Sequence, residues 1–266
     1  MSIIPTSNVL KDDFDWEIPV ETVPLPSEGV VYSPDSVLYN RKTVDITAMT
    51  AEEEDILTSA ALIKKGETIN HLIKSCVTDK TINPNELLLG DRNALMVSIR
   101  ITGYGQEYKS SIKCPHCNHL NKRTIDLANL PLQFLKLTPV DKGSNEFEYV
   151  LPVTKKKVLF KFLTVGDEKE RSSIREKMNK HFDMHAETNV TSMLEQAIQG
   201  VDGIRDKNKI KHFIQYMPAY DSKSLRTFIQ QNEPGINMEY DLVCDDCQGD
   251  SPVSVPITSE FFWPEF

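Results

Sequence analysis

The chain has 266 residues, of which 39% are hydrophobic and 26% are charged, and its net charge at pH 7 is -9. This size and composition are those of an ordinary soluble protein with one large domain or two modest ones. The acidic balance argues against a general nucleic-acid binder, because affinity for phosphates comes from clustered Lys and Arg. No apolar run approaches the roughly 20 residues that cross a bilayer. The first residues lack the pattern of a secretory signal, so we expect folding in a cytoplasm.

Residues 1–43 are predicted to form an extended arm. Prolines recur through this segment too closely for a helix to form between them, at Pro5, Pro19, Pro24, Pro26 and Pro34. The arm either lies on its own domain or docks on a neighbouring subunit, and the residues favour neither. A short strand is expected to follow over residues 43–47.

Residues 44–105 are predicted to form a helical domain. Thr50 and Glu53 make a capping box for a helix that Gly66 ends, and the spacing of apolar residues over 69–77 predicts a second helix. Asn83, followed by Pro84 at the first helical position, predicts the start of another helix. Asp91 is the expected N-cap of a central helix over residues 92–101.

Two short cysteine pairs follow, Cys114 with Cys117 and Cys244 with Cys247. Apolar residues alternate with polar ones on both sides of each pair, which predicts strands that enter and leave a tight turn. Residues 112, 114, 117, 125 and 127 all have counterparts 130 residues later in the chain. The pattern therefore predicts two similar hairpins, residues 106–130 and 237–266, that form the two halves of one zinc ribbon. Four thiolates are the ligands of a closed structural zinc site.

Other uses of these thiols are conceivable. A redox dithiol usually has one pair at a helix start, and two disulfides need an oxidising compartment. His116 and His119 could replace a cysteine as ligands, but with four thiols available we expect exposed turn residues. Cys76 has no partner in the sequence and is expected to pack as a small hydrophobic residue.

Residues 131–236 are predicted to form an insertion between the ribbon halves. Alternating apolar residues predict a hairpin near residues 147–162, followed by helices over 167–181, 191–199, 206–217 and 221–233. Asp206 caps the third of these helices, and Asp221 or Ser222 caps the fourth. His181 and His185 have helical spacing for a metal pair, although the protease motif is absent. We expect no metal there.

The aromatic chain end, residues 261–266, is expected to be buried on the ribbon or in a groove of another subunit, because a free tail would expose too much apolar surface.

Several segments together resemble a known family. They are LPSEGVVY (25–32), ITAMTAEEEDILTS (46–59), LIKSCV (72–77) and LGDRNA (89–94), followed by Gly103, Gly105 and the cysteine pairs. In this order they are similar to the baseplate hub proteins and hub assembly proteins of T-even-type contractile-tailed phages. The resemblance implies a virion or assembly component whose partners are other baseplate or hub proteins. It would be found in the host cytoplasm during assembly, and in the tail baseplate if it is retained.

These observations predict an α+β protein with a structural zinc bound by Cys114, Cys117, Cys244 and Cys247. The leading hypothesis is a non-enzymatic baseplate hub component with no nucleic-acid or membrane partner. A zinc-ribbon nucleic-acid-binding or transcription factor is a second hypothesis, although Asp245, Asp246 and Asp250 would repel phosphate. A redox protein is a third.

Overall fold

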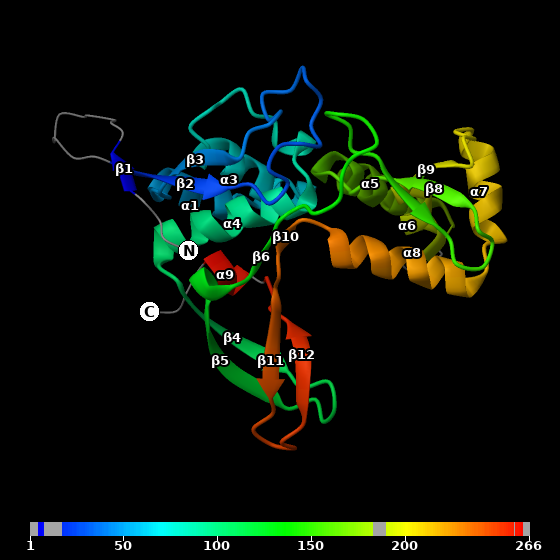
Figure 1. Cartoon of the computed structure of the whole chain (residues 1–266). Helices are drawn as coiled ribbons and strands as arrows, with labels where there is room; N and C mark the ends of the chain where they lie inside the picture. The colour runs from blue at the N-terminus through cyan, green and yellow to red at the C-terminus, as the bar shows by residue number, and fades with distance from the viewer. Residues whose placement is uncertain (1–4, 8–17, 183–189, 258, 263–266) are drawn as a thin grey trace.

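The computed structural model describes residues 5–7, 18–182, 190–257 and 259–262, with side chains left undescribed over 5–7, 174–182 and 259–260. The fold is α+β. Helices and small antiparallel sheets form a body, from which two hairpins project together as one arm (Figure 1). The two hairpins, residues 107–126 and 239–254, are called the ribbon below. The insertion between them lies in the body.

The N-terminal part of the body is a three-stranded sheet covered by helices. Strands β1 (Pro5–Ser7), β2 (Pro19–Pro24) and β3 (Thr43–Thr47) pair antiparallel in that order. The strand expected at 43–47 is therefore confirmed. Leu25 and Leu38, in the loop between β2 and β3, are fully buried. The described part of the N-terminal segment thus packs on its own chain.

The first expected helix is split in two. The capping box of Thr50 and Glu53 is present and starts α1 (Ala51–Thr58). Ser59 then adopts an extended conformation, and α2 (Ala60–Lys65) ends at Gly66, whose φ is 66°. Helix α3 (Thr68–Cys76) packs its buried face, Leu72, Ile73 and Cys76, against the body. The start signal at Pro84 gives only a 3-10 turn, η1 (Pro84–Glu86).

The central helix α4 (Leu89–Tyr104) starts earlier than expected, and the prediction that Asp91 caps it is wrong. Asp91 lies inside the first turn and is fully buried. Its carboxylate accepts hydrogen bonds from the backbone N–H and hydroxyl of Ser27 (2.9 and 2.5 Å) and from the hydroxyl of Tyr32 (2.5 Å). These bonds join two of the segments that carry the family resemblance, 25–32 and 89–94.

Gly90 brings the end of the insertion against the same turn of α4. A Cβ atom at this position would lie 1.7 Å from the carbonyl oxygen of Pro234. Short strand β10 (Gly235–Ile236) follows and pairs with β6 (Leu132–Gln133), which lies just after the first hairpin. The chain therefore leaves and re-enters the ribbon along paired strands beside α4.

The insertion contains a sheet that the sequence reveals only in part. The expected hairpin is confirmed as β7 (Phe147–Val150) and β8 (Lys157–Phe160). A third strand, β9 (Ile198–Val201), pairs with β8, where the sequence suggested the end of a helix. Phe147, Phe160 and Phe162 are buried and their rings are in contact.

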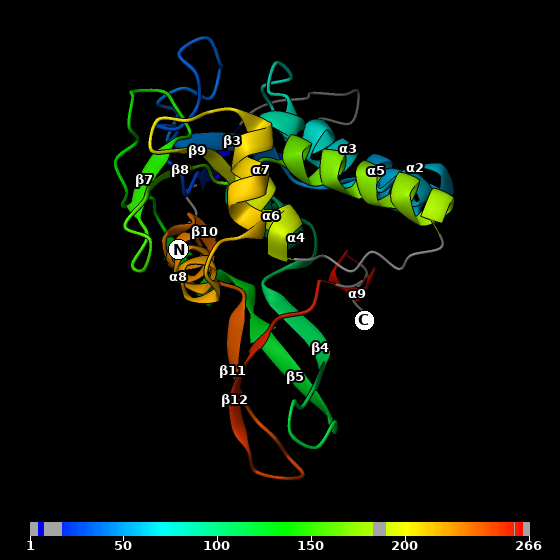
Figure 2. The same cartoon turned by 90° about the vertical axis from the view of Figure 1, so that its right-hand side faces the viewer.

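Helices α5 (Val165–Phe182), α6 (Val190–Ala197), α7 (Lys207–Gln215) and α8 (Ala219–Asn232) complete the insertion (Figure 2). Asp206 caps α7 as predicted. The prediction that Asp221 or Ser222 caps α8 is wrong, because the helix begins at Ala219 after Pro218. The buried Asp221 carboxylate instead accepts from the backbone N–H groups of Val153 (2.7 Å) and Thr154 (3.0 Å).

The ribbon consists of β4 (Glu107–Lys113) with β5 (Leu120–Asp126), and β11 (Glu239–Val243) with β12 (Asp250–Ser254). A short 3-10 turn, η2 (Leu127–Asn129), follows the first hairpin. The chain end returns to the root of the ribbon as α9 (Ser259–Phe262), where Phe261 and Phe262 are buried. The Phe261 ring packs edge-on against Tyr108 at 5.2 Å between centroids. The expected burial of the aromatic end on the ribbon is confirmed for Phe261 and Phe262; residues 263–266 lie outside the described residues.

Arg100 ties the root of the ribbon to α4. Its fully buried guanidinium donates to three backbone carbonyls, those of Phe261, Gly105 (2.8 Å) and Glu107 (3.2 Å). One side chain therefore joins α4, the first ribbon strand and α9.

Candidate metal centre

The two turns of the ribbon have the same backbone conformation. The amide of Cys114 donates to the carbonyl of His119 at 2.8 Å, and the amide of Cys244 donates to that of Gly249 at 3.0 Å. The amides of Asn118 and Gln248 bond the carbonyls of Cys114 and Cys244 at 3.0 and 3.1 Å. Each of these two donors has a left-handed φ, 62° and 57°. The offset of 130 residues thus relates the hydrogen bonds of the turns as well as their cysteines.

The structure brings the four predicted cysteines together. Their sulfur atoms all lie within 4.8 Å of one another and could hold a metal ion. Across the hairpins, the sulfur of Cys114 lies 3.7 Å from that of Cys247, and the sulfur of Cys117 lies 3.6 Å from that of Cys244. A regular tetrahedron of sulfurs at 2.3 Å from a zinc ion has edges of about 3.8 Å. The spacing of the sulfurs therefore fits a tetrahedral thiolate site.

Disulfide bonds do not link these cysteines in the structure. Bonded sulfurs lie about 2.05 Å apart, and all five cysteines of the chain are free. All four sulfurs also lie within 4.8 Å of one another, across the hairpins as well as within each pair. The pairs accordingly act as two halves of one cluster rather than as separate dithiols.

The surroundings of Cys244 favour its thiolate form. Burial raises the pKa of this thiol, but hydrogen bonds from the backbone amides of Cys247 and Asp246, together with Cys117 and Asn121, lower the pKa to about 6. A backbone amide hydrogen bond lowers the pKa of Cys117, but burial and the neighbouring thiols act in the opposite direction and raise it to about 12. Within the cluster, Cys244 is therefore the thiol that ionises more readily than Cys117. Burial and the nearby charge of Glu53 likewise raise the pKa of Cys76 to about 12. Cys76 is fully buried and is confirmed as a core residue.

Asn121 is a supporting residue that the sequence reasoning missed. Its fully buried amide lies 3.7 Å from the sulfur of Cys244 and donates to the carbonyl of His119 at 3.1 Å. Its oxygen accepts from the backbone N–H of Asp245 at 2.8 Å. A polar residue at an inward position of a strand was the available signal. Asn121 links the first hairpin to the turn of the second.

Arg123 makes a second link between the hairpins. Its guanidinium forms two hydrogen bonds with the Asp245 carboxylate, at 2.7 and 2.8 Å, and a third with the carbonyl of Val243 at 2.7 Å. His116 contacts the hydroxyl of Ser251 at 2.7 Å through its ring nitrogen. His116 and His119 are both exposed, as expected. They lie in the turn beside the cluster and are not part of it.

A comparison with known families identifies the chain. The family model described as T4 bacteriophage base plate protein matches residues 32–263, a range that includes both cysteine pairs and the whole insertion. The chain belongs to this family. No curated protein and no solved structure matches it. As a member of this family, the protein is a structural component of the phage tail baseplate, and its partners are other baseplate proteins.

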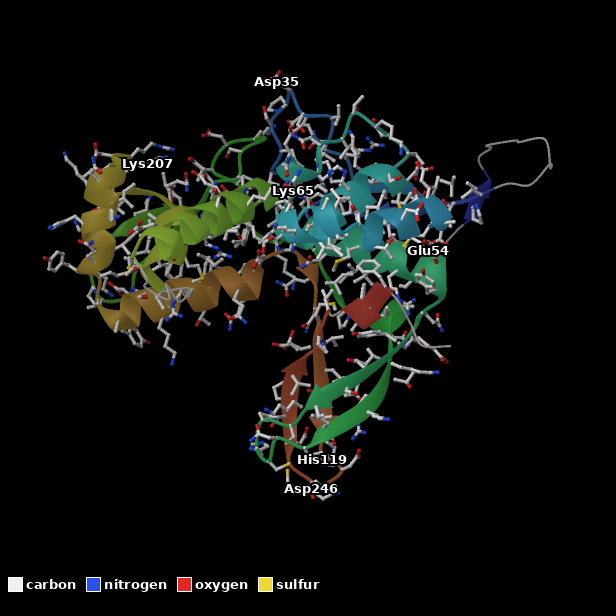
Figure 3. The ribbon with its side chains drawn as sticks, turned by 180° about the vertical axis from the view of Figure 1, so that it is seen from behind. Asp35, Glu54, Lys65, His119, Lys207 and Asp246 are labelled. Atoms are coloured by element: carbon white, nitrogen blue, oxygen red, sulfur yellow. The ribbon has the colours of Figure 1, made fainter. Side chains whose placement is uncertain are left out.

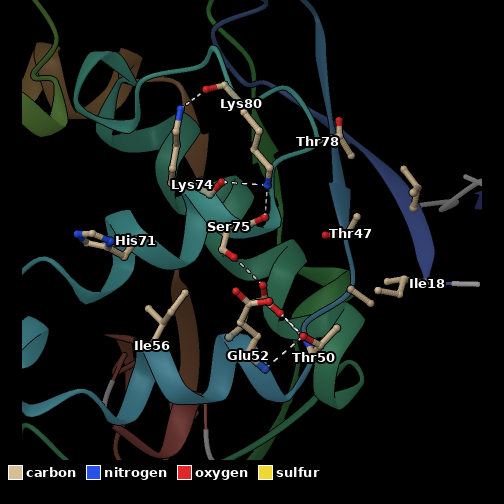
Figure 4. A pocket seen from close by; sticks show the side chains of 13 residues that line it. Ile18, Thr47, Thr50, Glu52, Ile56, His71, Lys74, Ser75, Thr78 and Lys80 are labelled. Carbon is tan, nitrogen blue, oxygen red and sulfur yellow. Dashed lines mark hydrogen bonds between the residues drawn. The ribbon is translucent and has the colours of Figure 1, made fainter. Parts of the chain in front are cut away.

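A second candidate for a functional site is a hollow in the N-terminal part of the body. The hollow, of about 730 Å³, lies between α1, α3 and the N-terminal sheet (Figure 4). Its polar groups bond one another: Ser75 donates to Glu53 at 2.6 Å, and Lys80 donates to the carbonyl of Ser75. These bonds join α1, α3 and the loop after α3.

Two further predictions concern metals and membranes. The possible His181 and His185 pair falls outside the side chains that the structure describes. Within the described residues, the four-cysteine cluster is the one group of His, Cys, Asp and Glu that could hold a metal ion. Among the same residues, no helix is both long enough and apolar enough to span a membrane.

Proposed function

We propose that this baseplate protein is a non-enzymatic component of the baseplate hub, and that a zinc ion bound by Cys114, Cys117, Cys244 and Cys247 fixes its ribbon as a rigid docking arm. The observation that carries the proposal is the cluster of four sulfurs at the end of a projecting pair of hairpins. We also propose the limits of the parts as 1–43, 44–105, 106–130, 131–236 and 237–266.

Zinc is the metal that best suits this ligand set. Soft thiolates in a tetrahedral arrangement select zinc or iron–sulfur centres, and four cysteines from two short turns are typical of structural zinc sites. Such an ion supplies a cross-link and has no free coordination position for a substrate. The chain's own contribution is to hold the thiolates at the required spacing, through the turn hydrogen bonds and Asn121.

The cross-link has a large effect on the chain because it closes a loop of about 130 residues. A structural zinc of this kind contributes on the order of 10 kcal/mol to folding. At the other end of the ribbon, Arg100 and the Tyr108–Phe261 contact attach the hairpins to α4 and α9. The arm is therefore fixed at both ends. A rigid arm loses less conformational entropy when it docks on a partner than a flexible one does.

Metal analysis and thermal unfolding test the zinc site. We expect one zinc per chain in the purified protein, and its loss in Cys114→Ser and Cys244→Ser together with a large fall in the melting temperature. His119→Ala, which changes an exposed side chain in the same turn, is the control and should keep both. A metal-free wild type whose melting temperature equals that of the serine variants would overturn the proposal.

The hub assignment is supported by the motifs shared with hub and hub assembly proteins, and it is tested separately. Hub intermediates and finished tails are purified from infected cells and probed for this polypeptide. Presence in both indicates a permanent subunit, and presence in the intermediates alone indicates an assembly factor. Absence from both would contradict a hub role while leaving the zinc site intact.

A further inference from the structure

The two hairpins of the ribbon have the same fold but opposite charge on their outward sides. Buried residues such as Tyr108 and Ile112 in the first hairpin, and Leu242 in the second, face inward. The alternate positions point outward and are exposed. On β4 and β5 these include Lys109, Lys113 and Lys122, called the basic face below; on β11 and β12 they include Glu239, Asp241 and Asp250, called the acidic face.

In each hairpin, three successive outward-facing residue pairs carry one of these charges each, and Lys109 and Glu239 occupy equivalent positions. Lys109 pairs across its hairpin with Thr124, and Glu239, which lies 130 residues after Lys109, pairs with Ser254. At the root of the ribbon the same side also carries two acids, the exposed Glu107 and the half-buried Asp126 across the hairpin from it. The acidic face has no Lys or Arg among its strand residues, all of which are described. Arg123 and Asp245, which bond each other within the chain, belong to neither face.

Each face also exposes one large apolar side chain near the cluster. Leu120 is 62% exposed and lies across the hairpin from Lys113. Val243 is 51% exposed and lies across the hairpin from Asp250. Leu120 thus lies beside positive charges on the basic face. Val243 lies beside negative charges on the acidic face. Apolar contact surrounded by complementary charge is typical of specific protein interfaces.

We propose that the basic face of the ribbon in one copy docks on the acidic face of the ribbon in a second copy. The contact is heterologous, because each copy uses a different face toward each of its two neighbours, so repeated docking produces a ring or a row of chains. Figure 3 shows the ribbon projecting clear of the body, with His119 and Asp246 from the two hairpins labelled at its end. The body therefore leaves the end of the ribbon accessible to a neighbour.

The contact between two free chains is expected to be weak. A two-stranded ribbon seven residues long has a footprint of roughly 230 Å² on one side, well below the surface that a stable interface buries. Screening by salt weakens it further. In a closed ring, each added contact is made at a high effective concentration. The proposal needs the observed packing of the ribbon but does not depend on which metal holds it.

Cross-linking with a carbodiimide, which joins a lysine to a carboxylate without a spacer, tests the contact directly. Light and isotopically heavy chains are mixed at low salt, cross-linked and digested. We expect peptides that join a light chain to a heavy one, with Lys109, Lys113 or Lys122 linked to Glu239, Asp241 or Asp250. Absence of such mixed links at high protein concentration, or mixed links only between other surfaces, would overturn the proposal.

A charge exchange provides a second test. Lys109→Glu with Lys122→Glu reverses the basic face, and Glu239→Lys with Asp241→Lys reverses the acidic face. Each double variant alone should lose at least about 10-fold in cross-linked product, because like charges then meet. Mixing the two should restore the product, with links between residues 109 or 122 of one chain and 239 or 241 of the other.

The matched control reverses two exposed lysines of α7, Lys207→Glu with Lys209→Glu, which changes the net charge by the same amount far from the ribbon. It should cross-link like the wild type. Unchanged circular dichroism and melting temperature verify that all variants are folded. Equal losses in the α7 control, or no recovery in the mixture of folded ribbon variants, would contradict docking between the two faces.

Discussion

The body and the ribbon of this baseplate protein are stabilised in different ways. In the body, side chains such as Leu72, Leu95 and Phe160 are completely buried among residues from distant parts of the chain. In the ribbon, each hairpin has only two strands, and one side of every strand faces solvent. An isolated two-stranded hairpin is at best marginally stable in water. The body is therefore held by apolar packing, whereas the ribbon has little core of its own and is held by the cysteine cluster at its end and by a few contacts at its root.

Among changes outside the cysteine cluster, the largest effect is expected where the chain returns from the body to the ribbon. Gly90→Ala places a methyl group on the Pro234 carbonyl, and neither backbone can move without shifting α4 or the return to the ribbon. We expect a loss of about 3 kcal/mol or more in the free energy of unfolding, measured by denaturant titration. Ser98→Ala, at a half-exposed position of the same helix, should change it by less than about 0.5 kcal/mol. Similar stability of the two variants would show that the close approach is absent.

Asn121→Ala is expected to weaken the cysteine cluster of the ribbon while leaving the packing of the body unchanged. The substitution removes the amide beside Cys244 and the acceptor for the backbone of Asp245. Changes next to metal ligands typically cost 10- to 100-fold in affinity, so we expect a zinc affinity lower by about that factor. Competition with a chromophoric chelator measures it. Thr124→Ala, at an exposed position of the same strand, is the control. If the chelator concentration that removes half of the zinc were unchanged, Asn121 would have no role in supporting the site.

Tyr108→Phe is expected to have a smaller effect at the root of the ribbon. It keeps the ring against Phe261 and removes the hydroxyl that donates to the carbonyl of Pro256 at 2.7 Å. The loss of one hydrogen bond corresponds to about 1 kcal/mol. Hydrogen exchange should report it as faster exchange of ribbon amides, with amides of the body unchanged. Tyr220→Phe, at a 65% exposed position of α8, should alter neither set. Equal acceleration in the body would mean that the ribbon does not open separately.

The smallest effect is expected at a surface ion pair of the body. Hydrogen bonds from Thr81 and from Arg41 lower the pKa of Asp79 to about 2. Because this pKa lies below the ordinary value of 3.8, the carboxylate stabilises the fold above that value, and the stabilisation is lost as the pH falls toward 2.

We therefore expect Asp79→Asn to lower stability by no more than about 1 kcal/mol at pH 6. The difference from the wild type should shrink between pH 4 and pH 2, as followed by thermal unfolding across this range. A difference that grows as the solution is acidified would contradict the assignment.

Local signals in the sequence predicted the features that local residues determine. The capping box at Thr50 and Glu53, the cap at Asp206 and the hairpin of β7 and β8 all depend on residues close together in the chain, and all are present. The cysteine cluster was also predictable, although its halves are far apart, because the same residue pattern recurs after 130 positions. The repeated pattern indicated that the two distant cysteine pairs belong to similar hairpins.

The wrong predictions concern residues whose partners are distant and leave no repeated pattern. Asp91 and Asp221 both stand where a cap is plausible, but each is buried and bonds a segment more than 60 residues away. Strand β9 follows α6 without a turn signal and becomes a strand because it pairs with β8. Tertiary contacts override local preference in these cases. Asn121 was missed for the same reason, since its role depends on a turn in the other hairpin.

The placement of the insertion between the two halves of the ribbon determines the order in which the protein matures. During synthesis the first cysteine pair leaves the ribosome roughly 7–26 s before the second, at ordinary elongation rates of 5–20 residues per second. The four-cysteine cluster cannot form until the second pair has been made and the insertion between the pairs has brought its two ends together. The complete set of four thiols is thus available to the proposed zinc ion only late in synthesis, after almost the whole chain has been made.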